Sequence, residues 1–284
     1  MTAQAFFAPT TTGEVLDLLA LHGEQAVIVN GGTDIVERLN SGAIRPAAIV
    51  YIREVKELDY IREQDGYLAI GGICTYRSMQ EAPLCQGFTG LQEALAEIGS
   101  PPIRVVATPA GNIGTAASGA DCNVVLMALG ASVVLSSARE ERVVHVDELF
   151  SGPAKTCRRA NELIREIRLP LAVGASAFIK LAKRKAQDIA QISTCVCLKQ
   201  DANGKCAAVR IALGAVASRV VRVPSMEKLV EGKTLEEALV AIKGFVPGEI
   251  SLRNPKNRAY KEAVLGVIVS RALKKAYAET VRSS

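Results

Sequence analysis

The stretch "AVIVNGGTDIVERL" (26–39) joins an apolar, β-branched run to a helical pattern through two glycines. Residues 25–29 predict a short strand, and the pattern from Ile35 onward predicts a helix. Asp34, followed by Glu37 three residues later, predicts a capping box at the start of that helix. A corner of this kind exposes unpaired backbone N–H groups, and glycine allows a ligand to approach them closely. The corner therefore suits an anion such as phosphate.

A second stretch strengthens this interpretation. The corner alone lacks the GxGxxG spacing of a dinucleotide turn and the Gly-Lys-Ser/Thr ending of a P-loop, so it also fits a plain tight turn. However, "TPAGNIGTAASGAD" (108–121) runs through small, uncharged residues as far as Asp121 and is flanked by apolar elements. Long loops inside compact domains are usually functional. Two such loops predict a clamp for a pyrophosphate, with Asp121 accepting hydrogen bonds from a ribose or an amine.

Composition limits the class of protein. A chain of 284 residues with 49% hydrophobic and 22% charged residues is typical of a globular protein with two domains. The uncharged stretches are shorter than the roughly 20 apolar residues of a membrane helix, so we expect no membrane insertion. The N-terminal residues lack the basic and apolar regions of a secretory signal. We therefore expect a cytoplasmic protein.

Charge and cysteine usage argue against two further classes. The net charge of +5 is mild, there is no Trp, and the densest basic cluster, "KLAKRKAQ" (180–187), contains no aromatic residue that could stack on a base. We expect no nucleic-acid partner. The seven cysteines include no CxxC pair, and His22 and His145 are the only histidines. This pattern predicts no zinc site, no iron–sulfur cluster and no Ser-His-Asp triad in this chain.

The remaining pattern predicts a mixed α+β fold. Helical spacing from Thr12, the expected N-cap, to Gly23 predicts the first helix. A strand ends at Pro170, and the small, uncharged residues after it indicate a domain boundary near 171. Beyond the boundary, Asn203-Gly204 predicts a hairpin between two β-rich runs, and residues 257–279 predict a long amphipathic helix.

The two loops, in this order and about 75 residues apart, closely resemble the flavin-binding subunits of molybdenum hydroxylases, the xanthine dehydrogenase and carbon monoxide dehydrogenase group. The stretch "FIKLAKRKAQDIAQIS" (178–193) is similar to the segment of that family that reaches the flavin ring. Residues 209–223 and 253–273 are similar to its C-terminal domain. The resemblance covers essentially the whole chain.

The resemblance implies a fold and a cofactor. Residues 1–170 would form an FAD-binding domain of the vanillyl-alcohol-oxidase (PCMH) type, with two subdomains that divide near residue 55. Residues 171–284 would form a small α+β domain with a three-stranded sheet. The first loop would wrap the FAD pyrophosphate, the second would contact phosphate and adenosine, and the third segment would lie beside the ring. The implied cofactor-binding residues are Ile28, Val29, Asn30, Gly31, Gly32, Thr33, Asp34, Ile35, Thr108, Gly111, Asn112, Gly114, Asp121, Ile164, Lys180, Asp188 and Ile189. No catalytic residue and no metal ligand are implied.

One position departs from the family pattern. The family usually has Gly-Gly-Asn in the second loop, whereas this chain has Ala110, Gly111 and Asn112. The methyl group of Ala110 is tolerable if that position does not face phosphate. The resemblance leaves this contact open.

The resemblance also implies a division of labour. This chain would take electrons from a small two-iron two-sulfur subunit and pass them to NAD+ or another acceptor, while a large molybdopterin subunit would oxidise the organic substrate. An alternative is a free-standing FAD-dependent oxidoreductase of the same fold with its own substrate site. Its nearest candidates for a flavin link are His145 and Cys122, and neither lies in a recognisable linkage motif. A nucleotide-binding protein without redox chemistry would explain the two loops but not the third segment.

Overall fold

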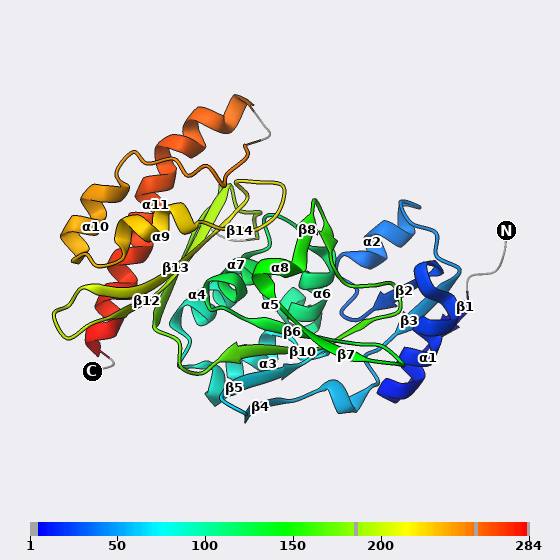
Figure 1. Cartoon of the computed structure of the whole chain (residues 1–284). Helices are drawn as coiled ribbons and strands as arrows, with labels where there is room; N and C mark the ends of the chain where they lie inside the picture. Colours follow the sequence, from blue (N-terminus) through cyan, green and yellow to red (C-terminus); the bar gives the residue numbers. More distant parts are fainter. Residues whose placement is uncertain (1–4, 185–186, 253–254, 283–284) are drawn as a thin grey trace.

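The computed structural model describes residues 5–184, 187–252 and 255–282. Its main sheets follow one another along the chain, from the blue N-terminal part to the red C-terminal part of Figure 1. Helices and strands are mixed throughout, as the sequence predicts. Among the described residues, no helix combines the length and apolar character needed to cross a membrane.

The first sheet is parallel and has the order β1-β3-β2. Its elements are β1 (Ala5–Phe7), α1 (Thr12–His22), β2 (Ala26–Val29), α2 (Ile35–Asn40) and β3 (Ala48–Tyr51). Helix α1 packs Val15 and Leu19 into the small core beneath the sheet. The predicted N-cap is displaced by one residue: Thr11, not Thr12, caps α1, in a capping box with Glu14. Gly23 ends the helix as predicted.

The second sheet is antiparallel, in the order β4-β5-β10-β6-β7. Its strands are β4 (Ile61–Gln64), β5 (Tyr67–Gly71), β6 (Ser132–Ser136), β7 (Glu141–His145) and β10 (Leu163–Pro170). The associated helices are α3 (Tyr76–Glu81), α4 (Thr89–Glu97), α5 (Pro101–Val106), α6 (Pro109–Thr115), α7 (Asp121–Ala128) and α8 (Val146–Leu149), with a small β8 (Phe150–Gly152) and β9 (Lys155–Thr156) ribbon. Helix α7 is buried all round, because it packs against the next sheet and against α4 and α6, and it shares one hydrophobic core with the second sheet.

The third sheet is antiparallel and contains β11 (Ala175–Leu181), β12 (Ile192–Gln200), β13 (Cys206–Gly214) and β14 (Val221–Arg222). Successive side chains of a strand point to opposite faces of the sheet, so neighbouring residues of β12 pack into different cores. Cys195 and Cys197 face the core shared with α4 and α7, whereas Val196 and Leu198 face the core shared with α11 (Pro255–Arg282). Two shorter helices, α9 (Pro224–Val230) and α10 (Leu235–Ile242), complete this part of the chain.

The expectation of a three-stranded sheet is corrected by β14, a two-residue fourth strand that pairs with β13 through Ala212 and Leu213. The strand is too short to produce a periodic signal, because Pro224 begins a helix two residues after it. The predicted hairpin and long helix are both present.

Candidate functional site

The two small-residue stretches meet at a hydrogen-bonded contact. Asn30, at the end of β2, donates from Nδ2 to the Thr108 hydroxyl at 3.0 Å and to the Gly72 carbonyl at 2.8 Å. Gly31 lies against the end of α5, where a Cβ would stand 2.0 Å from the Val106 carbonyl oxygen. The corner therefore needs glycine at 31 for close packing of the backbone, in addition to any contact with a ligand.

The capping box predicted at Asp34 is wrong. Asp34 precedes α2, but its side chain makes no capping hydrogen bond. Its backbone is already helical (φ −115°, ψ −50°), whereas an effective N-cap is normally extended. The carboxylate instead accepts a hydrogen bond from the Thr115 hydroxyl at 3.4 Å and lies 3.9 Å from the Arg38 guanidinium.

Much of the second stretch is helical, which corrects its interpretation as a loop. Helix α6 begins at Pro109, and the Thr108 hydroxyl caps it by accepting from the Gly111 amide at 3.0 Å. A Thr N-cap followed by Pro is a sequence signal for a helix start, although the two glycines obscured the helix. Ala110 packs into the core and is 7% exposed. The core therefore accommodates its methyl group.

A cavity of roughly 650 Å³ lies between the corner and α6. The predicted residues that line it are Ile28, Asn30, Gly31, Gly32, Thr33, Asp34, Ile35, Thr108, Gly111, Asn112, Gly114, Ile164 and Ile189. Val29 does not line it, and its side chain is buried. Tyr76 and Arg158 also line the cavity, and no sequence motif pointed to either of them.

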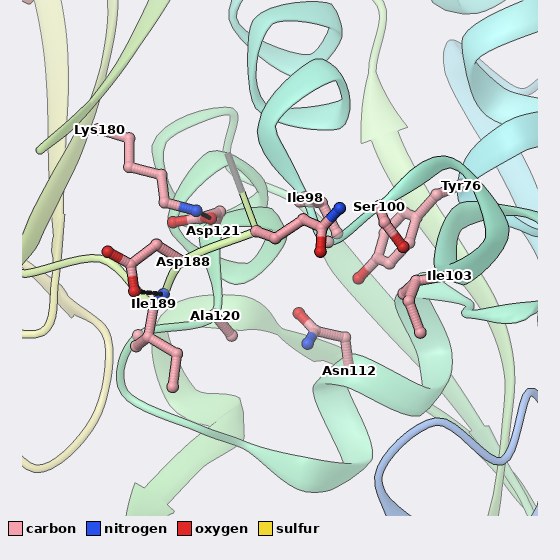
Figure 2. Close-up of a pocket in the computed structure, with 13 residues that line it drawn as sticks. Tyr76, Ile98, Ser100, Ile103, Asn112, Ala120, Asp121, Lys180, Asp188 and Ile189 are labelled. Atoms are coloured by element: carbon pink, nitrogen blue, oxygen red, sulfur yellow. Dashed lines mark hydrogen bonds and ion pairs between the residues drawn. The ribbon is translucent and has the colours of Figure 1, made fainter. Parts of the chain in front are cut away.

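A second cavity of roughly 310 Å³ adjoins the first (Figure 2). The remaining predicted residues, Asp121, Lys180 and Asp188, line this one. The two cavities have common wall residues: Tyr76, Asn112, Gly119, Ala120 and Ile189. The structure thus brings all the predicted residues except Val29 to one continuous cleft.

A buried ion pair occupies one wall of the smaller cavity. Lys180 Nζ lies 2.7 Å from Asp121 Oδ2, and each side chain is only 6% exposed. Burial raises the pKa of Asp121, while the nearby Lys180 ammonium opposes that rise. The Asp121 carboxylate compensates the positive charge of Lys180 within the protein. In return, the ion pair holds the Asp121 side chain in place at the cleft (Figure 2).

Asp188 organises its own loop. Its carboxylate accepts hydrogen bonds from the backbone amides of Lys183 at 2.9 Å, Arg184 at 3.0 Å and Ile189 at 3.0 Å. The amide bonds, that of Arg184 foremost, hold the pKa of Asp188 below its usual range. The adjacent Ile189 is 76% exposed although it lines both cavities. The loop thereby presents a large apolar side chain at the opening of the cleft.

Four buried polar atoms of the lining residues have no hydrogen-bond partner among the described residues: Asn30 Oδ1, Asn112 Oδ1, Asp121 Oδ1 and the Tyr76 hydroxyl. Burial, reinforced by the neighbouring Cys122, raises the pKa of Tyr76 well above its ordinary value, so this hydroxyl remains a donor. Buried polar groups are nearly always hydrogen-bonded. Their concentration along one cleft indicates a ligand that carries both donors and acceptors.

The cleft also has the size and the chemical variety of a cofactor site. Its larger part lies within the range of volumes typical of such sites. One end is apolar, with Ile28, Ile52, Leu163 and Ile164, and the small residues of α6 follow it. At Gly114, a Cβ would meet no heavy atom within 4 Å, so space beside this helix is open. These features fit a long ligand with an apolar group at one end and polar groups beyond it.

Metal binding has no comparable support in the part of the chain that the structure describes. No group of three or more His, Cys, Asp or Glu residues is placed there to hold an ion. His145 and Cys122, the candidates for a flavin link in a free-standing enzyme, do not line either cavity.

Comparison with known proteins identifies the ligand class. Residues 2–172 match the family described as "FAD binding domain in molybdopterin dehydrogenase", and residues 177–276 match "CO dehydrogenase flavoprotein C-terminal domain". The nicotinate dehydrogenase FAD-subunit of Eubacterium barkeri is 30% identical over 92% of both chains. Among solved structures, a chain of carbon monoxide dehydrogenase from Hydrogenophaga pseudoflava matches with a TM-score of 0.88 and 28% identity, over 98% of this chain and 99% of the other. Quinoline 2-oxidoreductase from Pseudomonas putida matches with a TM-score of 0.88 and 26% identity, over 98% of both chains.

Proposed function

Because the chain belongs to the FAD-binding subunits of the molybdopterin dehydrogenases, we propose that it is the electron-transfer subunit of a larger complex, with one FAD in the joined cavities. It receives electrons from a small two-iron two-sulfur subunit and passes them to NAD+ or another acceptor. A large molybdopterin subunit oxidises the organic substrate. Relatives that match more than 90% of this chain are themselves dehydrogenase subunits, and one of them is named an FAD-subunit.

The observation that carries the proposal is the cleft with its unpaired buried atoms. The apolar end near Ile28 and Ile164 suits adenine, and the open space beside Gly114 suits the diphosphate. The smaller cavity, lined by Asp121, Asp188 and Ile189, suits the isoalloxazine ring. This placement puts Asp121 beside the ring, whereas the resemblance implies the adenosine side for the stretch that ends at Asp121. Bound FAD supplies a ring that accepts and releases one or two electrons, and the protein positions it. Asn30, Asn112, Tyr76 and Asp121 supply the hydrogen-bonding atoms that hold the cofactor along its length.

The family matches also support the proposed domains and partners. One match ends at residue 172 and the other begins at 177, so we place the domains at 1–170 and 171–284, with the first divided near residue 55. The Hydrogenophaga relative is named a "medium chain", a term for one chain of a multi-subunit enzyme. We extend this arrangement to the present chain and place the complex in the cytoplasm.

Affinity purification from the native host tests this function. We expect the chain to copurify with one small and one large protein, and the complex to show flavin and iron–sulfur absorption together with bound molybdenum. Addition of NADH should bleach the flavin absorption if NAD+ is the acceptor. A chain that emerges alone, yellow, and oxidises a substrate by itself would establish the free-standing oxidoreductase instead. A colourless chain would contradict both functions.

A further inference from the structure

Arg158 places an unpaired positive charge in the wall of the larger cavity. The cavity-lining residues include one other cation, Arg38, which lies near Asp34 and is half exposed. Arg158 is partly buried and forms no ion pair with a described carboxylate within 4 Å. A partly buried guanidinium that faces a cavity without a protein anion is suited to an anionic ligand.

The carboxylate of Glu162, which is close in sequence to Arg158, already forms an ion pair with another arginine. Glu162 is 1% exposed and binds the Arg142 guanidinium through two hydrogen bonds, at 2.7 and 2.9 Å. The same carboxylate accepts from the Arg159 amide at 2.7 Å. Burial lowers the pKa of Arg158, and the charge of Glu162 only partly opposes this. An arginine nevertheless remains protonated in proteins, so the site holds a cation whose charge the protein compensates incompletely.

One edge of the guanidinium is fixed and the other is available. Nη1 donates to the main-chain carbonyls of Glu162 at 2.5 Å and of Arg159 at 3.1 Å. Within the described ranges, Nε and Nη2 make no hydrogen bond. The two carbonyls therefore orient the planar group, which then presents two further nitrogens in a fixed geometry. A fork of this kind binds phosphate oxygens in pairs.

The position of Arg158 determines which part of a dinucleotide it can reach. Arg158 lines the cavity together with Leu163 and Ile164 at the apolar end, and β9, just before it, packs beside α6. It does not line the smaller cavity. The residue thus lies between the proposed adenine and diphosphate positions, away from the proposed ring position.

Given FAD in the cleft as proposed above, we propose that the Arg158 guanidinium binds the diphosphate of FAD on its AMP side and makes the site selective for FAD over FMN. FMN contains the flavin ring and one phosphate but lacks the AMP half. Loss of this contact should therefore weaken FAD binding without an equal effect on FMN. The same charge should make FAD affinity depend on salt concentration.

The test measures Kd for FAD and for FMN on the full 284-residue chain stripped of cofactor, by quenching of flavin fluorescence. Arg158→Gln keeps a donor for the two carbonyls but removes the charge, and it should weaken FAD about 10- to 100-fold while FMN changes less than about 2-fold. Arg158→Lys keeps the positive charge but lacks the forked pair of donors, so its FAD affinity should lie between those of Arg158→Gln and the parent chain.

Arg159→Gln is the matched control, because Arg159 does not line the cavity: its guanidinium pairs with Glu140 and lies 3.8 Å from the Glu162 carboxylate. It should leave both affinities unchanged. An unchanged FAD affinity in Arg158→Gln, or an equal loss of affinity for FAD and FMN, would overturn the proposed role of Arg158 but not the proposed position of FAD. If Arg158→Gln fails to fold, the ratio of FAD to FMN affinity in Arg158→Lys decides between the same outcomes. Failure of the parent chain to bind FAD would overturn the proposed cofactor position and this inference with it.

Discussion

The Gly114→Val chain is expected to fold like the parent chain and to lose FAD. Gly114 lies in α6 and lines the larger cavity, and a Cβ there meets no heavy atom within 4 Å. Its φ is not positive, so valine is not strained by the backbone. A branched side chain would instead occupy the space proposed for the diphosphate. We expect FAD affinity to fall about 100-fold or more, which corresponds to about 3 kcal/mol or more.

The measurement is the flavin content of the purified chain, together with thermal unfolding of the stripped chain. Gly13→Val is the control, since Gly13 is also helical and lies outside the cleft, and a Cβ there would meet only the Thr11 hydroxyl oxygen, at 4.0 Å. Gly32 is less suitable because its φ of +75° penalises any side chain. At Gly111, a Cβ would stand 3.1 Å from the capping hydroxyl of Thr108. Full flavin content in Gly114→Val would show that the diphosphate lies elsewhere.

Lys180→Met is expected to destabilise the chain strongly. The substitution leaves the Asp121 carboxylate buried without its counter-ion, and removal of one partner of such a pair typically costs about 3–5 kcal/mol. Urea unfolding of the cofactor-free chain at neutral pH measures the loss. The double variant Asp121→Asn, Lys180→Met removes both charges and should recover a large part of it.

The destabilisation should depend on pH in a defined direction. Burial already raises the pKa of Asp121 in the folded chain, and loss of the opposing Lys180 charge should raise it further. A carboxyl group with a raised folded-state pKa takes up a proton more readily in the folded state than in the unfolded state, so stability is regained as the pH falls. The loss of unfolding free energy caused by Lys180→Met should therefore become smaller as the pH is lowered from about 8 to about 5. A small penalty that does not change with pH would show that the pair is unimportant for the fold.

The fold could be predicted where local signals are strong. The corner after β2, the hairpin at Asn203 and Gly204, and the long α11 follow from glycine placement and apolar periodicity, and the structure contains all three. The family resemblance, which the comparisons confirm, supplied the overall arrangement. Elements with weak or competing signals were missed. Two glycines concealed α6, and β14 has only two residues.

Cap positions were less predictable because neighbouring residues compete for the same role. Thr11 and Thr12 are chemically equivalent candidates, and only the backbone decides that Thr11 caps α1. At Asp34, the sequence matches a capping box, but Thr115 and Arg38 from α6 and α2 attract the carboxylate. Tertiary contacts of this kind have no signature in the local sequence.

The site was predicted best where its residues are contiguous. The corner and the α6 stretch each appear as one motif, so both could be assigned to the cleft from sequence. Tyr76 and Arg158 belong to no motif, and only the folded chain brings them to the cavity. Lys180 was expected beside the cofactor, but that it is bound to Asp121, 59 residues earlier, follows only from the packing of β11 near α7. Loop residue Asp188 likewise turned out to bind its own backbone.

Amide hydrogen exchange of the cofactor-free chain, measured with and without added FAD, shows whether FAD binds in the joined cavities. FAD in the joined cavities should protect backbone amides at 28–35, at 108–121 and near Ile164 and Ile189, because the ligand would order these segments around itself. Residues 224–242, in α9 and α10, line neither cavity and should exchange equally in both states. Protection confined to other segments, with the corner and α6 unchanged, would contradict the account.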